Sequence, residues 1–235
     1  MSHRQRSKKY RAVKEKVSSA KRYKLAEALT ILEQVKIVKF DESVDLAVRL
    51  GVDPKQGDQQ VRGACPLPHG LGKKIRVIVF AKGEKEKEAS AAGADEVGAE
   101  DLVKKVEEGW MEFDKAIATP DMMKIVSKLG RVLGPRGLMP NPKLGTVTFE
   151  VKKAVAEAKQ GVAEYKLDKA AILHISVGRT SFGAEKLREN IRAVMGSILK
   201  AKPPSSKGVY LKSVGLSSTM SPGIRLDLAD LQTGS

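Results

Sequence analysis

The hydrophobic pattern of this 235-residue chain changes character twice, and that change limits the folds open to it. Apolar residues alternate with more polar ones over 44–50, the period of a strand with one buried face. Residues 75–81 instead form a short, nearly continuous apolar run, which is typical of a strand covered on both faces. A β-strand pattern returns after Gly161, in 165–167 and 172–177. The pattern therefore predicts two kinds of β-sheet in one chain.

Helical spacing and turn residues predict the remaining elements. Apolar residues at helical spacing indicate amphipathic helices over about 24–36 and 184–201. Further strands are expected over 59–66, 208–216 and 222–228. In the middle of the chain strands and helices alternate, which favours a parallel sheet. The strands expected there are 75–81, 94–97 and 116–118, and the helices are 84–92, 100–108, 121–129, which ends at Gly130, and 150–159.

One architecture accounts for both patterns, and its fold class combines α/β and α+β. Residues 1–70 and 161–235 form a discontinuous α+β domain, and residues 71–160 form an α/β domain inserted into it. Such an insertion is physically permissible because chain ends and insertion points tend to lie close together on domain surfaces. Two consecutive domains divided near residue 130 fit the periodicity almost as well.

The charge distribution follows the same division. The chain carries 43 Lys and Arg against 28 Asp and Glu, a net charge of +15. Residues 1–70 and 151–235 each carry +7, whereas residues 71–150 carry only +1. Positive charges in such excess repel one another, and binding of a polyanion relieves this repulsion. Nucleic acid is the commonest polyanionic partner. The alternative is a basic protein whose charge serves solubility alone.

The scarcity of aromatic residues narrows the kind of nucleic acid. Only 4% of the residues are aromatic, fewer than a platform for stacking successive single-stranded bases requires. Phe40, Tyr165 and Phe182 lie in or beside the basic segments. Each is a candidate for contact with a base or ribose, and equally a candidate for the core. Structured RNA, recognised by its backbone, shape and 2′-hydroxyls, is therefore favoured over single strands.

The residue types that usually carry catalysis or bind metal are scattered. His3, His69 and His174 lack metal-ligand spacing, and the single Cys65 excludes an internal disulfide or a cysteine cluster. Nucleophile-elbow, zinc-protease and Walker A patterns are absent from the sequence. We therefore expect neither enzymatic activity nor a cofactor, with a small α/β enzyme in residues 71–160 as the alternative. No apolar run reaches the ~18 residues that a membrane span needs, so we expect no membrane association.

Two segments have no regular apolar pattern. Residues 1–22 are polar and basic, and are expected either as a solvated arm or as a tail that lies along phosphates. Glycines and prolines exclude regular structure over 134–142, around Arg136. An arginine among glycines is suited to cradling an anion, but a rigid structural loop is the preferred interpretation.

Several short stretches of the sequence resemble one family, and they occur in the family's order. They are KFDE at 39–42, DQQVRG at 58–63, LPHG at 67–70, AKGE at 81–84, AGAD at 92–95, GWMEFD at 109–114, ATPD at 118–121, LGPRGLMPNPK at 133–143 and TM at 219–220. On these residues the chain resembles the L-one family of ribosomal proteins of the bacterial large subunit. The resemblance extends over about residues 30 to 228, and the stretch at 133–143 is its most specific part.

The resemblance implies both a fold and a function. It implies a split β-α-β RNA-binding domain made from both chain ends, with a Rossmann-like domain, without a nucleotide, inserted. Family members bind large-subunit ribosomal RNA at the mobile stalk and assist release of deacylated tRNA from the exit site. In bacteria they also repress translation of their own operon by binding messenger RNA. The partners expected for this chain are therefore the large ribosomal subunit and its RNA, exit-site tRNA and its own messenger RNA, with a cytoplasmic, ribosome-associated location and a monomeric free state.

The family's RNA-binding positions carry over to three basic or hydroxyl-rich segments of this chain. Lys and Arg are suited to phosphates, Ser and Thr to 2′-hydroxyls, and exposed apolar side chains to a base or ribose. Where the family often has glycine, this chain has Ser221, which costs stability if the backbone there needs a positive φ. The residues expected to bind RNA are Lys39, Phe40, Ser43, Ser217, Ser218, Thr219, Met220 and Ser221, with Lys166, Lys169, His174, Arg179 and Ser181 as neighbours.

Overall fold

The computed structural model describes residues 7–18 and 20–232, so Arg4 and Arg6 of the expected basic arm lie outside the described residues. The chain divides into two compact units, unit 1 within Met1–Gly72 and Ala163–Ser235 and unit 2 within Lys73–Val162. Each unit has a hydrophobic core of its own. The predicted mixed α/β fold class is confirmed. That the two units are domains with separate roles stays a prediction.

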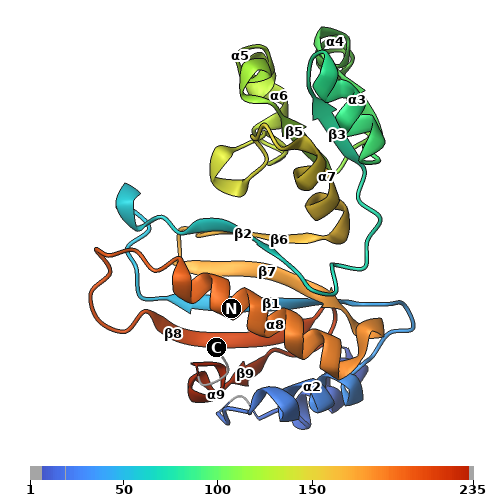
Figure 1. The fold of residues 1–235 in the computed structure, drawn as a ribbon. Helices are drawn as coiled ribbons and strands as arrows, with labels where there is room; N and C mark the ends of the chain where they lie inside the picture. Colours follow the sequence, from blue (N-terminus) through green and yellow to red (C-terminus); the bar gives the residue numbers. More distant parts are fainter. Residues whose placement is uncertain (1–6, 19, 233–235) are drawn as a thin grey trace. The chain divides into compact units, whose positions relative to one another are not determined.

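Unit 1 is built on a four-stranded sheet with the order β7-β1-β8-β9. These strands are β7 (Ile172–Arg179), β1 (Ser43–Leu50), β8 (Leu211–Ser218) and β9 (Ile224–Leu226). Strand β1 pairs antiparallel with both β7 and β8, so β7 and β8 run in the same direction. Helix α8 (Gly183–Lys200) joins β7 to β8, as Figure 1 shows. The result is a split β-α-β arrangement, with β1 inserted between the two strands that the helix connects.

The two faces of this sheet differ. Val44, Leu46 and Val48 of β1 are buried in the core of unit 1. That core is closed by α8 and by α2 (Leu25–Gln34), which contact each other and the sheet. The residues between them along β1 point the other way and are exposed or half-buried. The sequence alternation therefore reports the buried and open faces of β1 correctly.

Buried polar contacts fix the connection that leaves unit 1 after β2 (Arg62–Pro66), a strand that pairs with β6 (Val162–Lys166). Asn190 on α8 is completely buried. Its side-chain amide accepts a hydrogen bond from the His69 N–H at 3.1 Å. It also donates to the carbonyls of Gly70 at 3.1 Å and Val177 at 2.8 Å. Three backbone groups that would otherwise lack partners are thereby satisfied.

Unit 2 has a parallel sheet with the order β4-β3-β5. Its strands are β3 (Val77–Phe80), β4 (Glu96–Gly98) and β5 (Lys115–Ala118), and its longer helices are α3 (Glu84–Ala91), α4 (Glu100–Glu107) and α7 (Val151–Gln160). Ile78 and Phe80 of β3 pack into one apolar cluster, and Val77 and Val79 into another. Strand β3 is therefore covered on both faces, as its continuous apolar run predicts.

The prediction that Gly130 ends a helix is wrong. The helical path from Pro120 to Leu133 is a series of short helical pieces that include α5 (Met123–Val126) and α6 (Gly130–Leu133). Gly130 has helical dihedral angles, φ −55° and ψ −32°. Glycine permits these angles as it permits others, and burial of Leu129 and Leu133 on either side of Gly130 favours the continued path.

Two segments without an apolar pattern also take definite structures. Residues Lys8–Glu15 form helix α1, which begins at Ser7, whose hydroxyl accepts a hydrogen bond from the Tyr10 N–H. None of its residues is fully buried, which explains why periodicity misses it. The loop over 134–142 is irregular, as expected, and Asn141 N–H donates to the Thr146 hydroxyl at 2.7 Å.

Candidate nucleic-acid interface

One end of the four-stranded sheet brings together three segments that are far apart in the sequence. They are residues 39–43 before and at the start of β1, residues 179–181 at the end of β7, and residues 217–221 at the end of β8. Ser43 is paired with Arg179 in the sheet, and Val44 with Ser218. We call these three segments the strand-end cluster. It contains ten of the residues that the sequence predicts to bind RNA: Lys39, Phe40, Ser43, Arg179, Ser181, Ser217, Ser218, Thr219, Met220 and Ser221.

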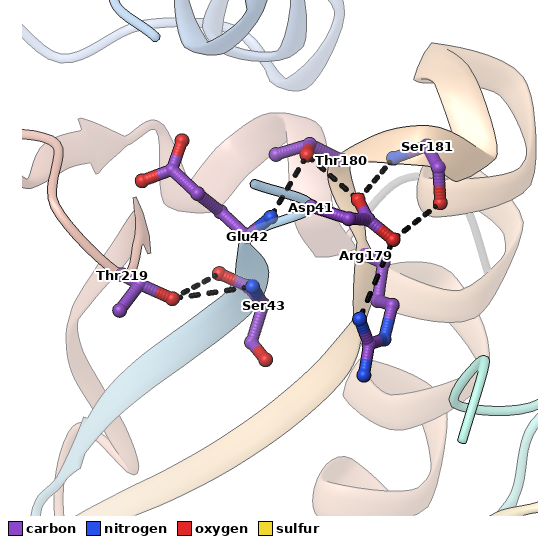
Figure 2. A network of polar contacts seen from close by, with 7 residues as sticks. All are labelled: Asp41, Glu42, Ser43, Arg179, Thr180, Ser181 and Thr219. Carbon is purple, nitrogen blue, oxygen red and sulfur yellow. Dashed lines mark hydrogen bonds and ion pairs between the residues drawn. The ribbon is translucent and has the colours of Figure 1, made fainter. Parts of the chain in front are cut away.

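The carboxylate of Asp41 ties the start of β1 to the end of β7 (Figure 2). It accepts hydrogen bonds from the Thr180 hydroxyl at 3.0 Å, and from the Ser181 N–H at 3.0 Å and hydroxyl at 2.8 Å. The Arg179 guanidinium lies 3.5 Å from the same carboxylate. Burial alone would raise the pKa of Asp41, but the hydrogen bonds from Ser181 and Thr180 and the charge of Arg179 outweigh burial and lower the pKa.

A second set of hydrogen bonds holds the turn after β8. The Thr219 hydroxyl accepts from the Ser43 N–H at 3.2 Å, and the Thr219 N–H donates to the Ser43 carbonyl at 3.1 Å. The Met220 N–H donates to the carboxylate of Glu42 at 2.9 Å. Glu42 is only 1% exposed, so this bond lies beneath the surface. Contacts from the start of β1 therefore fix both residues at the tip of the turn.

This polar framework carries two exposed apolar side chains. Phe40 is 52% exposed and Met220 is 51% exposed. Among the described residues, the only other large apolar side chains so exposed are Phe149 and Val209. Both side chains belong to the same cluster and are therefore available for contact with a partner. The arrangement can place a ring and a thioether against a base or ribose while nearby cations meet phosphates.

The hydroxyl groups of the cluster do not all face solvent. Those of Ser181 and Thr219 make the intramolecular hydrogen bonds described above, and the Ser221 hydroxyl accepts from the Ser218 N–H at 2.8 Å. Ser218 is buried, and its hydroxyl has no partner among the described residues. The expectation that the Ser218 hydroxyl reaches RNA is therefore corrected, because β8 turns that side chain inward. Ser43 and Ser217 are half-buried at the surface of the cluster.

Three predicted RNA-binding residues lie away from the cluster. Lys166 and Lys169 line a hollow of about 470 Å³ near the opposite end of β7. His174 is exposed on the open face of the sheet, beside Ala47. Its Nε2 lies 3.8 Å from a carboxylate oxygen of Asp168. The predicted set is therefore divided between two ends of unit 1.

The structure also separates the three candidate aromatic residues. Tyr165 is buried, and its hydroxyl lies 3.0 Å from that of Ser197. Phe182 is half-buried and packs against the core of unit 1. Phe40 alone of the three is exposed. Tyr165 and Phe182 thus serve the core, the alternative that the sequence left open.

The prediction omitted three residues that organise the cluster, Asp41, Glu42 and Thr180. Asp41 and Glu42 follow Lys39 and Phe40 directly, and Thr180 lies between the predicted Arg179 and Ser181. Their position next to predicted residues was a usable signal. The charge of Asp41 and Glu42 argued against an RNA-binding site, because carboxylates repel phosphates. In the structure these carboxylates instead accept hydrogen bonds from other parts of the protein.

The structure also bears on membrane insertion and metal binding. In the part of the chain that the structure describes, no helix is both long and apolar enough to cross a bilayer. Over those same residues, His, Cys, Asp and Glu side chains do not gather in threes as candidate metal ligands.

Comparison with known proteins gives a consistent result. A model of the Ribosomal protein L1p/L10e family matches residues 31–222. The large ribosomal subunit protein uL1 of Bdellovibrio bacteriovorus is 57% identical over 220 residues, which cover 94% of this chain and 94% of that protein. The match spans all three segments of the strand-end cluster.

Proposed function

Because the chain belongs to the Ribosomal protein L1p/L10e family, and is thereby a structural constituent of the large ribosomal subunit that binds ribosomal RNA, we propose that the strand-end cluster is its main RNA-binding surface. The observation that carries this proposal is the pair of exposed side chains, Phe40 and Met220, held on one hydrogen-bonded framework. Such a surface suits a fixed RNA shape, since the backbone that presents these side chains needs little reordering on binding.

The chemistry of the cluster assigns separate roles to its residues. Phe40 and Met220 provide apolar contact with a base or ribose, and Lys39 and Arg179 attract phosphates. Asp41 and Glu42 do not address the RNA; they hold the backbone that presents the other residues. Lys166, Lys169 and His174 form a second contact region on the same unit.

We extend the proposal to two further activities. The first is assistance to the release of deacylated tRNA from the exit site of the ribosome. The second is repression of the protein's own operon, in which messenger RNA occupies the same surface as ribosomal RNA. Both are binding roles without a catalytic step. The proposed location is the cytoplasm, on the ribosome. The free protein is proposed to be a monomer.

Alanine substitutions at the turn after β8 test the main proposal. Thr219→Ala and Met220→Ala should each weaken binding to a stalk fragment of large-subunit ribosomal RNA by about 1–3 kcal/mol. Val209→Ala is the matched control, because Val209 is an apolar side chain 72% exposed outside the cluster. The measurement is a filter-binding or fluorescence titration at one fixed salt concentration. Unchanged affinity for both variants would remove this turn from the site.

Competition tests the regulatory role. If one surface serves both RNAs, a transcript of the operon leader should displace the ribosomal fragment, and Met220→Ala should weaken both complexes by a similar factor. Simultaneous binding of the two RNAs would contradict a shared surface. Co-sedimentation with large subunits, with and without deacylated tRNA, addresses the role at the exit site.

A further inference from the structure

A hollow with four cations lies on unit 1 at the end of the sheet opposite the strand-end cluster. It measures about 280 Å³, and its charged lining residues are Arg22, Arg49, Lys212 and Arg225. Ser213, Val214, Leu226 and Leu228 complete the described lining. We call it the four-cation hollow. Its residues are distinct from those that the sequence predicts to bind RNA.

The register of the sheet brings these side chains together. Arg49 of β1 is paired with Ser213 of β8, and Arg225 of β9 is paired with Gly215 of β8. Paired residues of antiparallel strands point to the same face, which here is the open face that carries Arg49. Arg22 joins them because its neighbour Tyr23 bridges to Leu226 at the edge of the sheet.

The row of the open face that contains Arg225 otherwise carries small residues. In this row, Ala47 is paired with Gly215, and Gly215 with Arg225. Neither Ala47 nor Gly215 has a long side chain, so no bulky neighbour covers Arg225 from within this row. Long basic side chains around a hollow suit a tetrahedral anion better than a flat base.

The four cations lack intramolecular compensation. None of them makes an ion pair or a side-chain hydrogen bond with any residue in the described part of the chain. The described lining contains no acidic residue. Two acids near Arg225 in sequence are engaged elsewhere: Asp230 accepts from the Leu25 N–H at 2.8 Å, and Asp227 from the Ala229 N–H at 3.2 Å. Four like charges around one space repel one another, and a bound anion relieves that repulsion.

The positive surface extends beyond this hollow. Lys212 also lines a neighbouring hollow of about 520 Å³, whose lining includes Lys207, Ser205 and one acid, Asp53. Five cations line the two adjoining hollows against this one described carboxylate. Such an excess suits a chain of phosphates better than a single free anion. Arg49 and Ser43 lie six residues apart on β1, so the hollow is about 20 Å along the strand from the strand-end cluster.

From these observations we propose that the four-cation hollow binds backbone phosphates of the same RNA, as a further contact separate from the strand-end cluster and from the region of Lys166, Lys169 and His174. The proposal rests on the function proposed above and adds a site to it. The hollow provides charge and the cluster provides shape, so the two differ in how they respond to salt. Only an RNA that spans the whole length of the sheet engages both.

The dependence of affinity on salt tests this assignment. The double variant Arg49→Gln with Arg225→Gln should make the slope of log affinity against log salt less negative by about two, one for each lost phosphate contact. If the two affinities coincide at 1 M salt, that change corresponds to roughly 100-fold weaker binding of the stalk fragment at 0.1 M salt. The control, Lys186→Gln with Arg188→Gln, removes the same charge from the exposed face of α8 and should leave the slope nearly unchanged.

Phosphate ethylation interference gives a second readout. The wild-type complex should show a group of sensitive phosphates that the Arg49→Gln, Arg225→Gln complex loses, while the groups at the other contact regions remain. A slope equal to that of the control, with no group lost, would overturn the inference while the strand-end cluster could still bind RNA. If the wild-type protein does not bind the stalk fragment at all, the proposed function itself fails. Thermal unfolding verifies that the variants fold.

Two further probes identify the source of the anion. Inorganic phosphate and poly-glutamate are each titrated into wild-type protein and into the double variant. If either binds through these arginines while the RNA slope stays unchanged, the site serves a free anion or an acidic polypeptide, and the RNA assignment is wrong. The RNA assignment is supported if phosphate and poly-glutamate both bind weakly and independently of these arginines, while the salt slope for RNA changes in the double variant.

Discussion

The two ends of the four-stranded sheet in unit 1 use polar residues in opposite ways. In the strand-end cluster, Asp41, Thr180 and Thr219 make hydrogen bonds to other parts of the protein and leave Phe40 and Met220 exposed. In the four-cation hollow, the charged side chains have no described partner. One end is organised internally and the other depends on an outside partner for its counter-charge. A single sheet can thus separate recognition of shape from attraction of charge.

The largest expected effect is on the affinity of the strand-end cluster for RNA. Phe40→Ala should weaken binding of the stalk fragment by about 1–3 kcal/mol, the usual value for one ring stacked on a base. The salt slope should stay that of the wild type, because no phosphate contact is removed. Titrations at several salt concentrations measure both quantities. A changed slope with little loss at fixed salt would show that the two ends are not divided as described.

A smaller effect is expected on stability, and it should depend on pH. Asp41→Asn should lower the free energy of unfolding by about 1 kcal/mol at pH 7, because a partly exposed, charged hydrogen-bond acceptor is lost. The pKa of Asp41 is lowered in the folded protein, so its contribution is fully present above the unfolded pKa of about 3.9. It is lost as the pH falls through the lower, folded-state value.

Urea denaturation of both proteins from pH 7 to pH 3 measures this difference. The free energies of unfolding of the two proteins should approach each other as the pH falls. A difference that increased on acidification would mean that Asp41 is not stabilised as a carboxylate. The Arg49→Gln, Arg225→Gln variant should show no such convergence, since no carboxylate is paired there.

A still smaller value is expected for the coupling free energy between the two ends. Met220→Ala and Arg225→Gln lie at opposite ends of the sheet and share no described contact, so their effects on RNA affinity should add to within about 0.5 kcal/mol. A double-mutant cycle on the stalk fragment measures the coupling. Coupling above 1 kcal/mol would mean that the two ends act as one site.

The smallest effect is expected for chemical labelling of Cys65, in the core of unit 1. Cys65 is buried, and its burial raises the pKa of the thiol, although a hydrogen bond involving Ser197 opposes that shift. Alkylation by iodoacetamide at pH 8 should therefore be very slow in the folded protein and fast after denaturation. Fast labelling of folded wild-type protein would indicate that the core opens locally.

Much of the fold was predictable because it depends on local patterns. Alternation over 44–50 identified β1, and the apolar run over 75–81 identified the doubly covered strand β3. Helix α1 was missed because none of its residues is fully buried, so no apolar period marks it. Gly130 was misread because a glycine stops a helix only where the packing on either side permits an end.

The candidate site was predictable only in part. Motifs indicated Phe40 and Met220, but the sequence contains no local sign that Asp41 binds Ser181, 140 residues later. The inward direction of Ser218 follows from the register with Val44. The four-cation hollow combines residues 22, 49, 212 and 225, and only pairing of distant strands brings them together. Long-range register is the information that periodicity and composition lack.

The position of β1 in the middle of its sheet has a consequence for how the protein is made. Its two neighbours, β7 and β8, are translated only after the whole of unit 2. At ordinary synthesis speeds of ~5–20 residues per second, the nascent β1 waits about 10 to 30 seconds for its second neighbour to emerge. During that interval its apolar side chains and unpaired edges need protection by chaperones or by transient contacts, and the later-encoded unit 2 can mature first.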